Sequence, residues 1–431
     1  MSVPSADAVV AGIDKDELVR LTLAVCNFDS SGTNEGPVAQ FVADWMRDEG
    51  FAVRKLGLFA DRFNVLGTWP GTGGGYSLIF NSHLDTAVRR TDTLRVRDPE
   101  SPMHYSAWVD GDELVGEGVV NDKGPMAAFL IAARAVKASG LRLKGDLLLS
   151  AALAETSHEP IDGIVGEVVE TQDLGTRYLV THGGIADYAL VAEGTGLSIV
   201  TVEAGMVYYK VTWLSDRPAF YTPYLPDRTT MPESPNMIVR AAAGIEVLER
   251  WAAEYQRKHA YESPGGLVIP KAQVSAIRSG TPTAPRTSPQ ICSLYVGAFI
   301  VPGADPLALR DEMQRALAEG GIPAPEIEIY LFRPGYEAKG AERLIESVRN
   351  AHIATVGSAP PAPNPATSSM WRDINGFNEV GIPAITYGPR SEGHAYRKSL
   401  TIESLYNAAC VYARTIVDIC NQAKPLPPKE S

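Results

Sequence analysis

Residues 76–86 read YSLIFNSHLDT, a short apolar run that ends in a group of polar side chains. Two more such runs follow, DLLLSAALA at 146–154 and YALVA at 188–192, and each is bounded by polar or turn residues. Runs of this kind are typical of strands buried on both faces of a mainly parallel sheet. Residues 125–139, PMAAFLIAARAVKAS, lie between the first two runs and predict a helix. The β–α–β order therefore predicts an α/β fold.

The pattern changes near residue 204. Residues 205–215, GMVYYKVTWLS, alternate apolar and polar side chains and predict an edge-type strand. Two helices and about four strands in all predict a self-contained α+β unit there. After residue 338 a helix, a Pro-rich loop, an apolar run and a final helix follow. We therefore expect one larger domain, formed by residues 1–203 and 338–431, with residues 204–337 inserted into it.

Composition excludes several classes of protein. The 431 residues carry a net charge of −12 and a pI near 5.2, which argues against a nucleic-acid-binding protein, since these usually present a basic face. No apolar run reaches about 18 residues, so no membrane span is expected. The first residues lack the basic and apolar regions of a secretory signal. The cysteines are scattered and predict buried thiols in a reducing cytoplasm; they are Cys26, Cys292, Cys410 and Cys420.

Histidine and carboxylate residues recur where the predicted strands end. His83 follows the first apolar run and Asp85 lies two residues further on. Residues i and i+2 of an extended chain share a face, so this carboxylate can contact the histidine or its ligand. Asp122 lies in a Gly-bounded turn before the predicted helix. The complete set of candidates is His83, Asp85, Asp122, Glu155, His158, Glu193 and His394.

The shared location of these residues is more informative than any one of them. A single H-x-D motif is usually a satisfied histidine near a surface acid, and a Gly-bounded aspartate is usually a turn residue. Together, however, the imidazole and carboxylate groups lie beyond the carboxyl ends of parallel strands, where open α/β sheets form their sites. Two histidines with carboxylates suit divalent transition metals, and we expect one or two ions of zinc, manganese or cobalt.

The ordered motifs SHLDT, G-x-G-x-x-N-D-K-G, a strand-end Glu, E-G-T-G and G-H resemble those of the co-catalytic metallopeptidases and amidohydrolases. This family includes aminoacylase, acetylornithine deacetylase, succinyl-diaminopimelate desuccinylase and the glutamate-releasing carboxypeptidases. The resemblance covers nearly the whole chain. It implies a catalytic domain with a zinc-peptidase-like mixed sheet flanked by helices, and an inserted two-layer α+β domain that serves as lid and dimerisation domain.

The resemblance also implies metal-binding roles. His83 would bind one metal ion, and Asp85 would orient the histidine. Asp122 would bridge two ions, Glu193 would complete the first site and His394 would complete the second. Such ions make hydroxide available near neutral pH, because a metal ion lowers the pKa of its water towards 7.

In the same resemblance Glu155 would be the general base, which takes a proton from that water and passes it to the leaving amine. The family usually has a second acid directly after this residue, as a ligand to the second ion, whereas here Thr156 follows. Either His158 substitutes for that acid, or the second site is weak or empty.

The inserted domain departs from the family pattern as well. Residues 214–224, LSDRPAFYTPY, lack the histidine that usually steadies the oxyanion. Residues 293–303, SLYVGAFIVPG, lack the Asp-x-Arg that usually grips a substrate carboxylate. Aromatic residues stand at or near these positions. We expect Tyr221 and Phe299 to contact the substrate, together with Arg372 from the segment before the last apolar run.

Three functions are compatible with these residues. The first is hydrolysis of a C–N bond in an N-acyl amino acid or a dipeptide-like amide. The second is hydrolytic deamination of a nitro-substituted aromatic amine with release of ammonia, because the ring would take up the negative charge and an oxyanion donor is needed less. The third is a non-catalytic binding relative, against which the retained base and bridging residues argue. We expect a small-molecule substrate, a homodimer or larger homo-oligomer, and no nucleic-acid or membrane partner.

Overall fold

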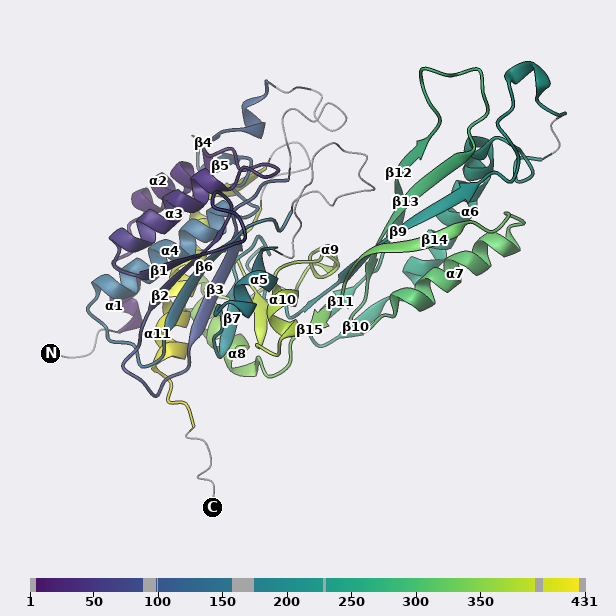
Figure 1. The fold of residues 1–431 in the computed structure, drawn as a ribbon. Coiled ribbons are helices and arrows are strands. Elements are labelled where there is room, and N and C mark those ends of the chain that lie inside the picture. The colour runs from purple at the N-terminus through teal and green to yellow at the C-terminus, as the bar shows by residue number, and fades with distance from the viewer. Residues whose placement is uncertain are drawn as a thin grey trace. The chain divides into compact units, whose positions relative to one another are not determined.

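The computed structural model describes residues 5–87, 98, 100–156, 174–227, 230–391 and 398–425. The chain divides into two compact units, whose elements are labelled in Figure 1. The first comprises residues 1–201, 338–364 and 372–431, and the second comprises residues 202–337 and 365–371. Segment 365–371 is expected in the larger domain, whereas the structure groups it with the inserted unit.

The first unit is built on a six-stranded sheet with the order β1-β2-β6-β3-β7-β16. The strands β6, β3, β7 and β16 run parallel to one another, whereas β2 and β1 are antiparallel additions at one edge. This mixed sheet confirms the expected fold class. The strands are β1 (Ala52–Leu56), β2 (Asn64–Trp69), β3 (Leu78–His83), β6 (Leu147–Ala152), β7 (Tyr188–Val191) and β16 (Ala384–Thr386).

Helices cover both faces of this sheet, as the complete burial of β3 and β6 requires (Figure 1). Leu78 and Phe80 belong to a core formed with α1, α2, α3, α4, α8 and α11, whereas Ile79 points to the opposite face and joins a core formed with α5 and α10. The helices are α1 (Ala6–Val10), α2 (Lys15–Cys26), α3 (Gly36–Asp48), α4 (Lys123–Ala138), α5 (Thr176–Thr181), α8 (Glu342–Val356), α10 (Ile374–Glu379) and α11 (Ile402–Asn421).

A small antiparallel sheet with the order β17-β5-β4 also belongs to the first unit. Leu114 of β5 and Leu400 of β17 join the same core as α4 and α11. This sheet therefore fixes the chain just before the Asp122 turn and just after the segment that carries His394. Its elements are β4 (Ala107–Asp110), β5 (Glu113–Gly116) and β17 (Ser399–Thr401), preceded by the 3-10 turn η1 (Pro102–His104).

The second unit is a two-layer α+β structure. Its four-stranded antiparallel sheet has the order β12-β13-β9-β14, and α6 and α7 pack against one face. The main elements are β9 (Gly205–Leu214), α6 (Met237–Lys258), β12 (Ala272–Ser279), β13 (Ile291–Ile300), α7 (Pro306–Glu319) and β14 (Glu326–Arg333). The smaller ones are β8 (Val202–Glu203), η3 (Thr222–Tyr224), β10 (Tyr261–Ser263), β11 (Gly266–Val268), β15 (Tyr336–Glu337) and α9 (Pro365–Ser368).

The expectation of an edge-type strand at residues 205–215 is wrong, because β9 lies inside the sheet between β13 and β14. The alternation that suggested an edge has a different cause. One set of side chains points into the core beneath α6 and α7, and most of the residues between them are half-buried on the opposite face. The core set is Val207, Tyr209, Val211 and Trp213.

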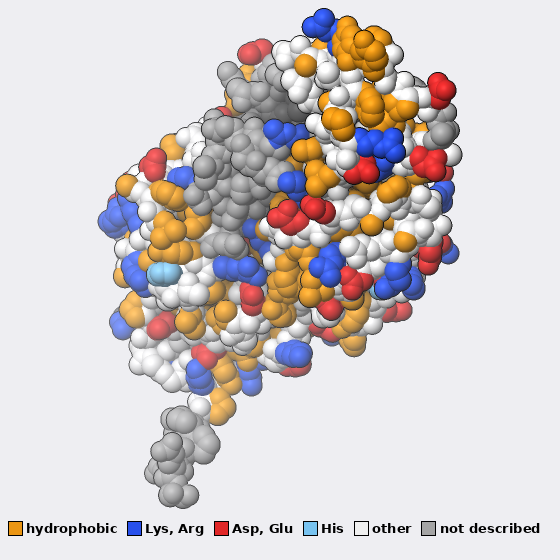
Figure 2. Space-filling model, turned by 45° about the vertical axis from the view of Figure 1, so that its right-hand side comes forward, with side chains coloured by type: hydrophobic (Ala, Val, Ile, Leu, Met, Phe, Trp, Pro, Cys, Tyr) orange, Lys and Arg blue, Asp and Glu red, His pale blue; other side chains and the backbone are white. Residues whose placement is uncertain are grey.

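The described part of the chain contains no helix that is both long and apolar enough to cross a membrane. On the face drawn in Figure 2, Lys and Arg side chains are interspersed with Asp and Glu, and they do not gather into a continuous basic patch. This distribution argues against a nucleic-acid interface on that face.

Candidate functional site

Five of the predicted site residues meet at the carboxyl end of the parallel strands in the first unit. His83 is the last residue of β3, Asp85 follows two residues later, and Glu155 and Glu193 follow β6 and β7. Asp122 joins them from the N-cap position of α4. All five are 7% exposed or less. The parallel order of β6, β3 and β7 brings these residues together, because it places three strand ends at the same edge of the sheet.

The imidazole of His83 lies between three carboxylates. Its Nε2 is 3.4 Å from Asp122 Oδ2 and 3.6 Å from Glu155 Oε2. Its Nδ1 is 2.9 Å from the carbonyl oxygen of Asp85 and 3.3 Å from Asp85 Oδ1. A carbonyl oxygen only accepts, so Nδ1 donates, and in the neutral ring the lone pair is on Nε2. The nitrogen that can bind a metal ion is therefore the one that faces Asp122 and Glu155.

Asp85 fixes the backbone that carries Glu155. The Glu155 N–H donates to Asp85 Oδ1 at 2.9 Å, and the Thr156 N–H and hydroxyl donate to Asp85 Oδ2 at 2.8 and 2.9 Å. Burial would raise the pKa of Asp85, but hydrogen bonds from His83, Glu155 and Thr156 hold it below its ordinary value. Thr156, the residue that replaces the family's second acid, thus has a structural partner.

Negative charge is concentrated in this cluster. Burial raises the pKa of Asp122 well above its ordinary value, and the charge of Glu193 raises it further. Burial raises the pKa of Glu155 in the same way, with a further contribution from Glu193. The pKa of His83 also rises, because the charges of Asp122 and Glu155 outweigh the opposing effect of burial. Without a bound cation, protons must therefore neutralise part of this charge.

Arg372 is a second cation beside these carboxylates. Its Nε forms an ion pair with Glu193 Oε2, and both side chains are buried. The sequence predicts Arg372 to be a substrate contact. In the structure it forms an ion pair with the predicted metal ligand Glu193, and a contact with substrate stays a prediction.

The cluster fits a divalent cation on the chemistry of its donors. His83 Nε2, both Asp122 carboxylate oxygens and Glu193 Oε1 are buried and have no hydrogen-bond partner among the described residues. Leaving such atoms unpaired is costly, and imidazole nitrogen with carboxylate oxygen is a ligand set suited to zinc, manganese or cobalt. Within the described ranges, no three His, Cys, Asp or Glu side chains lie close enough together to hold a metal ion in their present positions. His158 and His394, the remaining predicted ligands, lie outside the described residues.

A second layer of buried polar residues supports the cluster, and the sequence analysis missed it. Asn81 Nδ2 donates to Asp373 Oδ2 at 2.8 Å and to Thr176 Oγ1 at 3.2 Å, while Ser150 Oγ donates to Asn81 Oδ1 at 2.7 Å. Burial raises the pKa of Asp373 to about 6. One signal was available in the sequence: Asn81 is a polar residue in a fully buried strand, where an amide needs partners.

Close backbone contacts hold the loop of Glu193 in place. The Gly388 N–H donates to Thr195 Oγ1 at 3.0 Å, and the Leu197 N–H donates to the Gly388 carbonyl at 2.8 Å. A Cβ atom at Gly388 would lie 2.1 Å from the carbonyl oxygen of Glu193, so the two loops touch through their backbones. On the other side, a Cβ at Gly194 would lie 2.9 Å from the Val120 side chain, which precedes Asp122.

The remaining predicted substrate contacts belong to the second unit. Tyr221 precedes η3 and is 46% exposed, and its ring centroid lies 6.3 Å from that of Tyr224. Phe299 lies on β13 and is 37% exposed. Their contact with a substrate stays a prediction.

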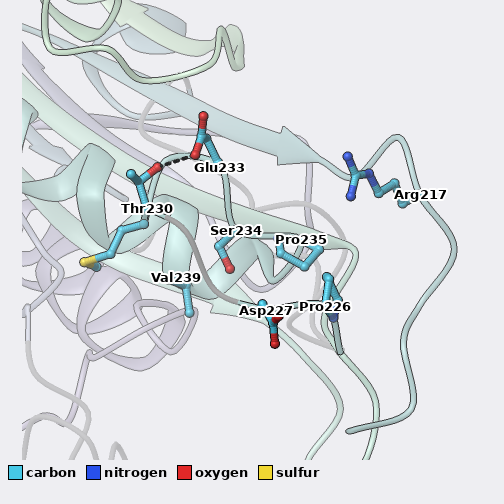
Figure 3. Close-up of a pocket in the computed structure, with 9 residues that line it drawn as sticks. Arg217, Pro226, Asp227, Thr230, Glu233, Ser234, Pro235 and Val239 are labelled. Atoms are coloured by element: carbon cyan, nitrogen blue, oxygen red, sulfur yellow. Dashed lines mark hydrogen bonds between the residues drawn. The ribbon is translucent and has the colours of Figure 1, made fainter. Parts of the chain in front are cut away.

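A large cavity of about 630 Å³ also lies in the second unit, and Figure 3 shows nine residues around it. Arg217, Asp227 and Glu233 contribute charges, and Thr230 Oγ1 donates to Glu233 Oε2 at 2.9 Å (Figure 3). None of the predicted site residues that the structure describes lines it. We therefore assign the chemistry to the buried cluster of the first unit and not to this cavity.

Residues 79–418 match the model of Peptidase family M20/M25/M40. The chain is 27% identical to the N-formyl-4-amino-5-aminomethyl-2-methylpyrimidine deformylase of Bacillus subtilis (strain 168), over 95% of this chain and 96% of that protein.

Solved structures share the fold at lower identity. The di-peptidase Dug1p from Saccharomyces cerevisiae aligns with a TM-score of 0.72 at 13% identity, over 97% of this chain and 99% of its own. The Bacillus subtilis YXEP protein, described as a dinuclear metal binding peptidase from the M20 family, aligns with a TM-score of 0.62 at 13% identity, over 94% and 98%. At these identities the likeness concerns the fold.

We predict that Gly388→Ala weakens metal binding by about tenfold or more, because the new Cβ would displace the loop of Glu193 and ligand-supporting groups typically contribute 10–100-fold to metal affinity. Competition with a chromogenic chelator measures this affinity. Gly12→Ala is the control: Gly12, like Gly388, does not have a positive φ, but the nearest atom to a Cβ there, the Val9 carbonyl oxygen, lies 3.3 Å away. Equal affinity of Gly388→Ala and wild type would show that the Glu193 loop does not depend on this contact.

We predict that Asp122→Asn stabilises the metal-free protein, and that the gain grows with pH. Because the pKa of Asp122 is raised in the folded state, the folded protein retains a proton that the unfolded chain releases above about pH 4. Wild type therefore loses stability as pH rises from 4 to 8, and the asparagine variant lacks the part of this loss that comes from Asp122. In thermal denaturation after metal removal with a chelator, the melting temperatures of Asp122→Asn and wild type should differ little near pH 4. At pH 8 the variant should melt about 2–4 °C or more above wild type.

The exposed Asp61→Asn serves as the control for this pH series, because Asp61 lies at the surface. Its melting temperature should follow wild type throughout. A gain for Asp122→Asn that is the same at every pH would contradict the proposed crowding of charge. Saturating zinc should reverse the order, because only wild type keeps the complete ligand set.

Proposed function

The chain belongs to Peptidase family M20/M25/M40, and we propose that its substrate is a small N-acyl compound or a dipeptide-like amide. Membership confirms the family resemblance of the sequence motifs and makes the protein a metal-binding hydrolase that acts on C–N bonds. The observation that carries the finer proposal is the setting of Glu155. This carboxylate is buried 3.6 Å from the metal-binding nitrogen of His83, on a backbone that Asp85 holds in place.

In this proposal His83, Asp122 and Glu193 hold metal, and His394 and His158 supplement them. The unpartnered buried atoms of the first three support this assignment. When bound, a divalent ion acts as a Lewis acid that polarises the amide carbonyl and makes water a usable nucleophile near neutral pH. We propose two ions per chain, since a relative with the same fold is described as dinuclear.

Glu155 acts as the proton shuttle. Burial raises its pKa, which makes the carboxylate a better base near neutral pH than an exposed glutamate. It takes a proton from the attacking water and delivers it to the nitrogen of the leaving amine. Asp85 takes no proton itself: it orients His83 through Nδ1 and Glu155 through the backbone N–H.

The amide substrate is supported by the deformylase relative, whose name describes removal of a formyl group from an amine and which matches nearly the full length of both chains. By analogy we propose a short acyl group on the substrate. Deamination of a nitro-aromatic amine has no comparable support. A purely binding role is disfavoured, because a scaffold gains nothing from burying three mutually repelling carboxylates.

The proposal has three further parts. The first unit carries the catalytic chemistry, and the second unit serves as the lid and dimerisation domain of a homodimer or larger homo-oligomer. The cytoplasm is the proposed compartment, because all four cysteines are buried free thiols.

We predict that Glu155→Gln lowers kcat by about 10²–10⁴-fold while leaving metal content unchanged, since the amide cannot accept the proton and Glu155 is not a ligand. The assay measures release of free amine from N-formyl and N-acetyl amino acids and from dipeptides, with ammonia release from a nitroanthranilate tested in parallel. The control is Glu379→Gln, which alters only an ion pair with Arg177. Full activity of Glu155→Gln would refute the base assignment, and ammonia release alone would refute the amide substrate.

We predict two metal ions per chain after reloading with zinc, manganese or cobalt, by elemental analysis of protein freed from excess metal. Asp122→Ala should retain none, because the bridge is lost, and His394→Ala should retain one. One ion per wild-type chain would mean that the second site lacks the ligand that Thr156 replaces. A full complement in Asp122→Ala would contradict the bridging role.

A further inference from the structure

We propose that the second unit binds a small monocarboxylate with a flat apolar body in a pocket of about 330 Å³. The pocket lies where the chain entering β12, the strand β13 and the helix α9 come together. It belongs wholly to the second unit, and its volume is at the lower end of the range for small-molecule sites. The proposal does not rest on the hydrolysis proposed above, and it gives Phe299, which the sequence predicts to contact the substrate, a different ligand.

The walls of this pocket expose large apolar side chains. Phe299 is 37% exposed and Met370 is 44% exposed, and Ile269, Pro365 and Ala366 extend the same lining. Large apolar residues at the surface of a concavity are typical of ligand sites. A planar ring seated here would bury its own area and cover the Phe299 ring, and thioether sulfur forms favourable contacts with aromatic edges.

Hydrogen bonds make the pocket rigid. The Ile269 N–H donates to Ser369 Oγ at 2.8 Å, and that hydroxyl donates to the Pro365 carbonyl at 2.5 Å, so the two sides are tied together. The Phe299 N–H donates to the Lys271 carbonyl at 2.8 Å and fixes the third wall against the first. A ligand would therefore meet a preformed surface and would not have to order it.

Charge defines the class of ligand. Among the described residues that line the pocket, Lys271 alone is charged, and its exposed ammonium forms no ion pair with any described residue. The hydroxyl of Ser369 is already committed to Pro365. One cation beside an apolar wall matches one carboxylate on an apolar ring. A sugar or nucleotide would leave most of its polar groups without partners.

The test is a calorimetric titration of the full-length protein with 2-naphthoate. Wild type should bind one molecule per chain with a dissociation constant in the sub-millimolar to millimolar range, as expected for a ligand of this size. Lys271→Met should weaken binding by about threefold or more, as expected for an exposed ion pair. Phe299→Ala should weaken it by about tenfold or more, because the apolar wall is lost.

Two comparisons give this test its specificity. Lys258→Met removes an exposed lysine of α6 elsewhere in the second unit and should bind as wild type does. The neutral 2-naphthamide should bind wild type more weakly than 2-naphthoate, and both should bind Lys271→Met equally. Binding should persist in Asp122→Ala, which is expected to retain no metal ion, and this separates the site from the hydrolytic centre. Absence of saturable binding to wild type, or unchanged affinity in both Lys271→Met and Phe299→Ala, would overturn the proposal.

Discussion

Three carboxylates are buried together beside one imidazole, and the first unit is organised around that concentration of charge. Asp122, Glu155 and Glu193 come from the start of a helix and the ends of two strands, and each is at most 7% exposed. Water cannot screen them, so burial raises the pKa values of Asp122 and Glu155, and the buried, unpartnered oxygens of Asp122 and Glu193 favour a bound cation. A fold that keeps such a cluster intact must hold it against electrostatic repulsion.

The rest of the unit supplies that restraint. Strands β3 and β6 are buried along their whole length between two layers of helices, so the strand ends have little freedom. Direct backbone contact between Gly388 and Glu193 fixes the loop of Glu193. The loop of Glu155 is fixed because the N–H groups of Glu155 and Thr156 donate to the Asp85 carboxylate. The Arg372 guanidinium neutralises Glu193 from a third direction. Repulsion within the cluster therefore destabilises the folded state, and apolar burial in the surrounding layers offsets that cost.

The sequence predicts local features of this arrangement well. The apolar run at 188–192 becomes β7 over Tyr188–Val191, and the helix expected at 125–139 spans Lys123–Ala138. The contact of His83 with Asp85 also follows from spacing, because the two residues are neighbours in the chain. Contacts between distant segments do not follow from it. The hydrogen bond of Asn81 with Asp373 joins residues 292 positions apart, and only the folded sheet brings them together.

Thr156 shows how a departure from a family pattern can be reinterpreted once contacts are known. From the sequence its position implies a missing metal ligand. In the structure both its N–H and its hydroxyl donate to Asp85, at 2.8 and 2.9 Å. A second carboxylate at this position would face Asp85 with like charge and could not make the hydroxyl bond. Thr156 therefore strengthens the link that positions the proposed base, Glu155, and in the proposed function the ligands that supplement His83, Asp122 and Glu193 are His158 and His394.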